Sequence, residues 1–231
     1  MNLYYQPDLD QGHFALDPDE SRHALKVMRL SKGDELDLTD GKGCFYKAKI
    51  ETADARKCEF RVLEKTTVPK KNFLIHIAIA PTKNIDRTEW FVEKAVEIGI
   101  DCISFIICEK SERRSVNMER MNKIAISAMK QSQQARLPQL AEMIPFHELI
   151  KITANQKFIA HVDHQNPHHL HSMAEKGGQY LVLIGPEGDF SQRELDEAGK
   201  NSFRKVSLGP HRLRTETAAL VACQTLNLLN L

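Results

Sequence analysis

Long apolar runs and a leader-like N-terminus are both missing from this sequence. No eighteen consecutive residues are apolar, so no segment is expected to cross a membrane as a helix. The first residues lack the basic stretch followed by an apolar stretch that a secretory leader has. The 231 residues are 42% hydrophobic, which is enough for one full-sized domain and a smaller one. We therefore expect a globular, cytoplasmic protein with no membrane partner.

Cysteine and excess charge are also scarce. The five cysteines are odd in number and widely spaced, a pattern that favours reduced thiols over a set of disulfides. The formal net charge is only +1, so the total charge gives no argument for a nucleic-acid partner. Such a partner has to be inferred from local groups of basic residues.

Short strands dominate the first part of the sequence. Apolar and polar side chains alternate over 35–39 and 46–50, on either side of a glycine-containing turn, and another strand is predicted at 60–63. Several short strands in so few residues predict a small β-barrel, which we place at residues 1–68. The polar, proline-containing stretch 66–71 predicts a linker.

From residue 72 to residue 231 the rhythm changes to strands that alternate with helices. One predicted helix ends at Gly99 and another covers 117–135. Continuous apolar strands between helices are typical of a parallel sheet covered on both faces, and therefore of an α/β fold. The predicted strands are 73–80, 102–108, 157–162, 180–184 and 205–208.

The segment 181–191 is the sharpest local motif. An apolar strand runs into a glycine-proline turn, and a helix then begins with the capping box Ser191 and Glu194. Ligands bind beyond the carboxyl ends of parallel strands, and Gly185 and Gly188 would let the backbone approach a flat ligand. The alternative is an ordinary turn that needs glycine only for its geometry. The motif is not the GxGxxG pattern of dinucleotide-binding sites.

The segment 206–219 repeats this order of strand end, glycine-containing loop and helix start. Thr215 suits the N-cap position, and Glu216 suits the first helical turn. Arg212 and Arg214 suit recognition of phosphate or carboxylate, unless they are simply solvated surface residues. The helix that follows is apolar on most faces, so it must be buried in its own domain or against another subunit.

Together these two segments resemble the RsmE family of 16S ribosomal RNA methyltransferases, within the SPOUT superfamily. The strings Ile184-Gly185-Pro186-Glu187-Gly188 and Leu213-Arg214-Thr215-Glu216-Thr217-Ala218 carry the likeness. The ordered set of matches is specific and covers nearly the whole chain. The further matching segments are 23–30, 33–34, 40–43, Lys83, 89–100 and 131–132.

The resemblance implies a fold, a cofactor and a substrate. The C-terminal part would be a SPOUT-type parallel sheet with a trefoil knot, and the N-terminal part a PUA-like β-barrel that binds RNA. The protein would be a homodimer that uses S-adenosylmethionine to methylate N3 of a uridine in the 16S rRNA of the small ribosomal subunit. The residues expected to hold the cofactor are Leu183, Ile184, Gly185, Pro186, Glu187, Gly188, Leu208, Gly209, Arg212, Leu213 and Thr217.

The chemistry of uracil suggests two catalytic residues. N3 carries a proton, so a site must accept that proton or stabilise the anion that its loss leaves. We predict that Arg214 stabilises the developing negative charge, and that Glu216 orients Arg214 or acts as a base. Glu187 is expected to satisfy N–H groups of its loop.

Four basic residues are predicted to bind RNA. Arg29 and Lys83 lie within the matched segments, and Arg113 follows the second strand of the larger domain. Arg136 lies two residues beyond Gln134, where the family has an arginine. Each contact with a phosphate should weaken as salt is raised.

The chain departs from the family pattern at two more positions. Asp189 stands where the family commonly has a second glycine, and Arg212 replaces an apolar residue.

The histidine-rich tract 161–171 has no closed tetrahedral spacing, so no metal site is predicted. A SPOUT enzyme that methylates ribose 2′-hydroxyls of tRNA, and a non-catalytic RNA-binding or ribosome-assembly protein, are the alternative functions.

Overall fold

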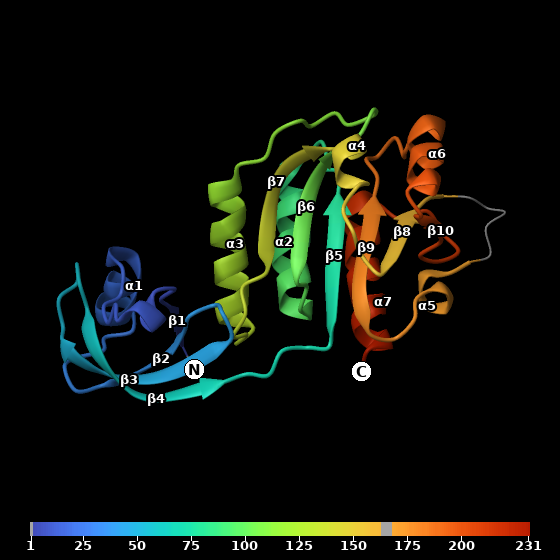
Figure 1. Cartoon of the computed structure of the whole chain (residues 1–231). Helices are drawn as coiled ribbons and strands as arrows, with labels where there is room; N and C mark the ends of the chain where they lie inside the picture. The colour runs from blue at the N-terminus through green and yellow to red at the C-terminus, as the bar shows by residue number, and fades with distance from the viewer. Residues whose placement is uncertain (1, 163–167) are drawn as a thin grey trace. The chain divides into compact units, whose positions relative to one another are not determined.

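The chain forms two compact units. A computed structural model describes residues 2–162 and 168–231 (Figure 1). The first unit contains the residues up to Lys70 together with 126–137, and the second contains the rest, from Lys71 to the C-terminus. The sequence predicts domains at 1–68 and 72–231; the first unit also includes the end of helix α3 (Met118–Gln131) and the residues after it. No helix among the described residues is long and apolar enough to span a bilayer.

A mixed four-stranded sheet forms the first unit. The strand order is β1-β2-β3-β4; β1 runs parallel to β2, and the other neighbours are antiparallel. The predicted strands are confirmed, and Ala15 adds a bridge to Glu59 at the start of β4. Apolar side chains of alternate strand positions fill the core. The elements are β1 (Leu3–Tyr5), η1 (Leu9–Gln11), α1 (Pro18–Arg22), η2 (His23–Val27), β2 (Glu35–Thr39), β3 (Cys44–Thr52) and β4 (Glu59–Thr67).

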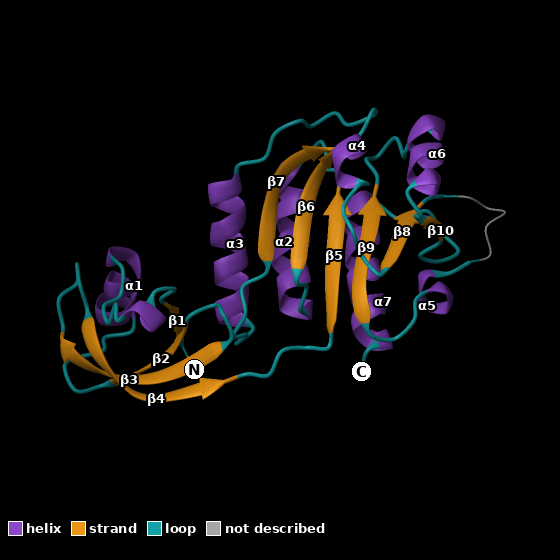
Figure 2. Cartoon of the chain, in the orientation of Figure 1, coloured by secondary structure: helices purple, strands orange, loops and turns teal. Residues whose placement is uncertain are grey.

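A parallel six-stranded sheet forms the second unit, as the sequence predicts (Figure 2). The strand order is β10-β8-β9-β5-β6-β7, so strands distant in sequence are neighbours in space. Five strands lie where they are predicted. The sixth, β7, is not predicted, because no residue in it is fully buried and Glu142 interrupts its apolar residues. The strands are β5 (Phe73–Ile79), β6 (Cys102–Ile107), β7 (Gln139–Pro145), β8 (Gln156–Ala160), β9 (Gly178–Ile184) and β10 (Arg204–Val206).

Helices pack on the sheet of the second unit. Helix α7 (Thr215–Leu229) contacts β5, β9 and α2 (Ile85–Ile98), while α4 (Phe146–Leu149) contacts β6, β7 and α6 (Gln192–Lys200). A further short helix, α5 (Leu170–Met173), contacts α7. The predicted end of α2 is confirmed, because Gly99 has the left-handed φ of 102° that glycine adopts without strain.

The two predicted helix starts have different outcomes. The capping box of α6 is confirmed, since the Ser191 hydroxyl and the Glu194 carboxylate each accept a hydrogen bond from the other's backbone N–H. The prediction that Thr215 caps α7 is wrong. Arg214 occupies the N-cap position without a side-chain cap, while the Thr215 hydroxyl donates to the Gly185 carbonyl oxygen. The hydroxyl thus bonds to a neighbouring loop rather than to its own helix.

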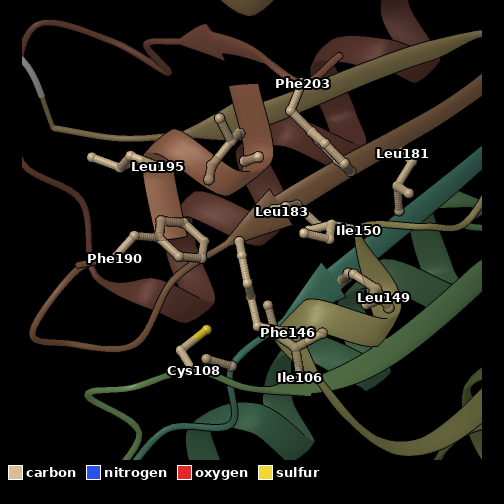
Figure 3. Packing of buried hydrophobic residues seen from close by; sticks show 14 residues of the cluster. Ile106, Cys108, Phe146, Leu149, Ile150, Leu181, Leu183, Phe190, Leu195 and Phe203 are labelled. Atoms are coloured by element: carbon tan, nitrogen blue, oxygen red, sulfur yellow. The ribbon is translucent and has the colours of Figure 1, made fainter. Parts of the chain in front are cut away.

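A continuous apolar cluster lies between the sheet and helices α4 and α6 (Figure 3). Leu181 and Leu183 of β9 meet Phe146 and Ile150 there, and the ring of Phe190 lies close to that of Phe146. All five cysteines are free, as the sequence predicts, and three of them are fully buried. This apolar cluster holds in place the carboxyl ends of the strands, from which the loops of the candidate site emerge.

His76 of β5 is a titratable group within this packed sheet. Its Nε2 lies 2.8 Å from the Ser104 hydroxyl of β6. Burial lowers the pKa of His76 from its ordinary 6.5 to about 4, because the charged imidazolium is poorly solvated there. The folded protein therefore keeps this side chain neutral at a pH where the unfolded chain binds a proton.

Replacing His76 by glutamine should reduce the loss of stability in acid. The unfolded chain binds a proton at His76 below its ordinary pKa, so the free energy of unfolding falls as the pH drops from 6.5 towards 4. Between pH 7 and pH 4.5 His76 lowers the free energy of unfolding by about 2 kcal/mol, and H76Q should lack this loss. Urea denaturation at both pH values measures the free energy of unfolding, with the exposed His147→Gln as control. Equal losses in wild type and H76Q would contradict the assignment.

Candidate active site

Two neighbouring clefts open at the carboxyl ends of β8, β9 and β10. The larger cleft has a volume of about 570 Å³ and the smaller about 360 Å³, which are sizes typical of small-molecule sites. The loop after β9 lines the larger cleft, and the loop after β10 lines the smaller one. The residues common to both clefts are Ala160, Val162, Arg212, Leu213 and Ala218.

The loop after β9 is tied to two other loops by hydrogen bonds. The Glu187 carboxylate accepts from the backbone N–H of Lys83 at 2.9 Å, which confirms that Glu187 satisfies a loop N–H, although in the loop after β5 rather than its own. Arg212 donates to the Glu187 carbonyl oxygen at 3.0 Å, and Thr215 donates to the Gly185 carbonyl oxygen at 3.1 Å. These bonds connect the loops after β5, β9 and β10 into one wall.

Basic residues after β6 support the same wall from outside the clefts. Lys110 Nζ donates to the Gly188 carbonyl oxygen at 3.0 Å. Arg113 donates from Nε to the Thr82 carbonyl oxygen at 3.1 Å and from Nη2 to that of Lys83 at 2.7 Å. A planar guanidinium suits two successive carbonyl oxygens better than an ammonium group does. Both cations therefore hold loop backbone in place.

Gly185 is required by a protein neighbour. A Cβ atom there would lie 3.0 Å from the Phe190 ring, which belongs to the buried cluster. The side chain of any other residue would have to displace that ring. The missing side chain thus lets the turn after β9 close over the core, in addition to leaving the backbone open to the cleft.

Asp189 has a backbone conformation that favours glycine. Its φ is 59°, in the left-handed region that aspartate tolerates better than most residues. One carboxylate oxygen accepts from the Phe190 N–H at 2.7 Å, and the other lies 2.9 Å from His161 Nδ1. The left-handed turn explains why glycine suits this position, and the contact with His161 links the loop to the end of β8.

The two predicted catalytic residues lie in different environments. Arg214 is exposed and lines the larger cleft, and its side chain makes no hydrogen bond or ion pair with any other described residue. Glu216 is buried, and its Oε1 lies 3.9 Å from Nε of Arg87, so its neighbouring cation is Arg87 rather than Arg214. Arg87 also lines the larger cleft, and no pattern in the sequence predicts it as a site residue. No sequence signal connects two residues so far apart along the chain.

Most of the predicted cofactor residues are brought together at the clefts. The larger cleft includes residues 184–187, and the smaller includes Leu208 and Gly209. Leu183 instead lies in the apolar cluster, and neither Gly188 nor Thr217 is among the residues that line either cleft. Twelve further residues line the clefts without a site role predicted from the sequence: Arg87, Ala160, His161, Val162, His169, Asp189, Val206, Ser207, Pro210, His211, Thr215 and Ala218.

The four predicted RNA-binding residues differ in how free their side chains are. Arg29 is exposed, has a left-handed φ of 59°, and has no partner among the described residues. Lys83 is 74% exposed and pairs with Glu112 at 2.8 Å. Arg113 is bound to loop carbonyl oxygens, and Arg136 donates to the carbonyl oxygens of Lys42 and Val68 within the first unit.

Part of the histidine-rich tract contributes to the smaller cleft. His161 and His169 line it, while residues 163–167 of the tract lie outside the described residues. Over the described ranges, no three potential metal ligands come together.

Replacing Asp189 by alanine should cost more stability than replacing it by glycine. Both variants lose the carboxylate, but only alanine has a Cβ atom in the left-handed conformation. We expect D189A to be less stable than D189G by about 1 kcal/mol. Urea denaturation of the two variants checks this. Equal stability would mean that the loop adopts another conformation.

Two family models match the chain. A model described as RNA methyltransferase domain matches residues 69–227, and one described as RNA methyltransferase PUA domain matches residues 16–63. The matches cover the two parts that the sequence analysis separates. They confirm the PUA-like character of the mixed sheet and the methyltransferase character of the parallel sheet.

Full-length relatives agree with these matches. The ribosomal RNA small subunit methyltransferase E of Rickettsia conorii is 29% identical, with 95% of this chain and 91% of that protein covered. A crystal structure of a probable rRNA-methyltransferase from Porphyromonas gingivalis is 46% identical, with a TM-score of 0.94 and coverage of 100% and 98%. That of ribosomal RNA small subunit methyltransferase E from Neisseria gonorrhoeae, bound to S-adenosyl methionine, is 26% identical, with a TM-score of 0.87 and the same coverage. With both domain models and full-length relatives in agreement, this chain belongs to the RsmE family of RNA methyltransferases.

Proposed function

We propose that this protein uses S-adenosylmethionine to methylate N3 of a uridine in the 16S rRNA of the small ribosomal subunit. The observation that carries the proposal is the pair of clefts between the loops after β9 and β10, in a chain whose relatives are named ribosomal RNA small subunit methyltransferase E. A solved relative of the same fold holds S-adenosyl methionine. The protein would act in the cytoplasm, where small subunits are found.

The residues around the clefts fit such a cofactor. Val162, Leu213 and Ala218 offer apolar surface for a flat ring, while the backbone of both loops offers polar groups for its edge. Bound S-adenosylmethionine would supply an electrophilic methyl group on a positively charged sulfur. The role of the chain is then to hold donor and acceptor in line, which by itself contributes much of the rate. The tied loops after β9 and β10 would provide that rigidity.

Arg214 is the residue proposed to act on the uracil. Loss of the N3 proton leaves negative charge on the ring, and a guanidinium at the edge of the cleft would stabilise it. Support comes from its place on the larger cleft and from the absence of any partner of its side chain among the described residues. Glu216 lacks a contact with Arg214 that would orient it, and its burial beside Arg87 favours a supporting role over that of a base.

Binding of RNA is proposed to depend on exposed cations. Arg29 and Lys83 have the accessible side chains that phosphate contacts need. Arg113 and Arg136 would contribute less directly, because their guanidinium groups already hold backbone carbonyl oxygens.

The proposal includes a homodimer and a knotted C-terminal segment. Helix α7 carries apolar residues on most sides, and Leu228 on it is 56% exposed. Trp90 of α2, the helix that packs against α7, is 42% exposed. Apolar surface on two adjacent helices suits a subunit interface. Threading of the chain end through the loop after β9 would be consistent with the bonds that Arg212 and Thr215 make to that loop.

Cofactor binding and product identification test the proposed reaction. Titration calorimetry should show binding of S-adenosylmethionine, and incubation with small ribosomal subunits should yield 3-methyluridine by mass spectrometry. A protein that binds RNA but not the cofactor would be a non-catalytic RNA-binding protein. Methyl groups found on ribose, or on tRNA, would contradict the substrate assignment.

Replacing Arg214 by alanine should lower kcat much more than cofactor affinity. Loss of one group that stabilises an anion typically costs about 100-fold or more in turnover, and we expect a loss of that order. The Kd for S-adenosylmethionine should stay nearly unchanged. Arg193→Ala, an exposed arginine of α6, is the matched control. Parallel losses in kcat and cofactor affinity would instead make Arg214 a cofactor-binding residue.

A further inference from the structure

Arg87 is one of three arginines on the larger cleft, and it has no role in the mechanism above. It lies in the first turn of α2, directly after the loop that follows β5. Its side chain is 41% exposed, and it lines the cleft together with Arg212 and Arg214. The side chain is therefore accessible from the cleft although its position in the chain is remote from both glycine-containing motifs.

Glu216 holds this arginine from the protein side. The Glu216 side chain is only 9% exposed, and its Oε1 lies 3.9 Å from Arg87 Nε. Its other oxygen, Oε2, is buried and has no hydrogen-bond partner among the described residues. A buried carboxylate needs a compensating charge nearby, and Arg87 is the cation paired with it. The pair therefore restricts where the guanidinium can lie.

The cleft around Arg87 is favourable for an anion. Three arginines line it, and its two acidic residues are already engaged: Glu187 with a backbone N–H, and Asp189 with a backbone N–H and His161. Arg87 and Arg214 also stand at the N-terminal ends of α2 and α7, where the helix dipoles add positive potential. A guanidinium has five donors, and at 3.9 Å the ion pair with Glu216 leaves them available to a ligand.

We propose that Arg87 binds a backbone phosphate of the RNA beside the target nucleotide, and that Glu216 is the positioning residue that holds Arg87 for this contact. The inference rests on the proposed function. A phosphate diester has the two oxygens that a guanidinium contacts in parallel, and phosphate contacts fix the register of a nucleic acid on a protein. Arg214 then acts on the reacting base, and Arg87 on the strand that carries it.

The division of roles predicts distinct kinetics for Arg87→Gln. Its KM for small ribosomal subunits should rise about tenfold, as expected for loss of one charge-assisted contact. Its kcat and its Kd for S-adenosylmethionine should stay within about twofold of wild type. The slope of log affinity against log salt for RNA should become shallower by about 0.7 to 0.9. With one phosphate contact fewer, binding of the RNA releases fewer counterions. Arg87→Lys should keep the slope but recover only part of the KM, since an ammonium lacks the parallel donors.

Glu216→Gln tests the positioning role. It should raise the KM for RNA without changing the salt slope, because Arg87 keeps its charge. In the double variant the Glu216 substitution should add nothing to the effect of Arg87→Gln, since Glu216 acts through Arg87. A loss of kcat from Glu216→Gln that persists in the double variant would overturn this role and make Glu216 a group that acts on its own.

Arg120→Gln is the matched control for folding. Arg120 also pairs with a mostly buried glutamate of α2, Glu89, but it lines neither cleft. Thermal unfolding of all variants separates loss of structure from loss of binding. An unchanged KM and salt slope in a folded R87Q would overturn the proposal. So would a weakened Kd for S-adenosylmethionine, which would mean that Arg87 binds the cofactor carboxylate instead.

The inference and the proposed function fail in different ways. If wild-type protein does not methylate small subunits, the proposed reaction is wrong. Fluorescence anisotropy with a short RNA hairpin then still compares the salt slopes of wild type and R87Q. A shallower slope for R87Q would support the phosphate site independently of catalysis, and equal slopes would overturn it.

Discussion

Hydrogen bonds from side chains to loop backbone hold the ligand-binding edge of the parallel sheet together. The backbone of the loop after β9 accepts them from the side chains of Lys110 and Thr215, and the Glu187 carboxylate of the same loop accepts one from the backbone N–H of Lys83. Loops that carry glycine have many accessible conformations, and each bond removes some of that freedom. The clefts keep their shape because separate segments restrain one another, with little help from regular secondary structure. A site that must align two reactants needs that restraint.

The arginines of this chain divide into those that build the fold and those that remain available. Arg113 and Arg136 are enclosed by carbonyl oxygens, so their charge stabilises loops. Arg29 and Arg214 have no such partners among the described residues, and Arg87 is only partly engaged. A net charge of +1 therefore conceals a cleft that is lined by three arginines. Composition cannot show this, because the relevant quantity is which guanidinium groups keep free donors after folding.

Local pattern predicts most of the sheet, and long-range geometry accounts for what it misses. Apolar runs mark the four inner strands of the sheet, whereas the edge strands β7 and β10 lack a continuous buried run, and of these two only β10 is predicted. The two glycine-containing motifs locate the clefts because parallel strands end at one edge of a sheet. The partner of Glu216 is different: it follows from the packing of α7 against α2, and no spacing rule connects those helices. The resemblance to a family supplies the cofactor and substrate, which the residues alone do not name.

The order in which the strands pair has a consequence for synthesis of the protein on the ribosome. Phe73 of β5 pairs with Gly178 of β9, and α7 at the very end of the chain packs against both strands. β5 can pair with β6 soon after both are translated, but its other neighbour, β9, is translated only about a hundred residues later. Closing so large a loop makes folding slow and leaves apolar strands uncovered meanwhile. Folding of this sheet therefore depends on long-range pairing, and its apolar strands are open to aggregation until that pairing is made.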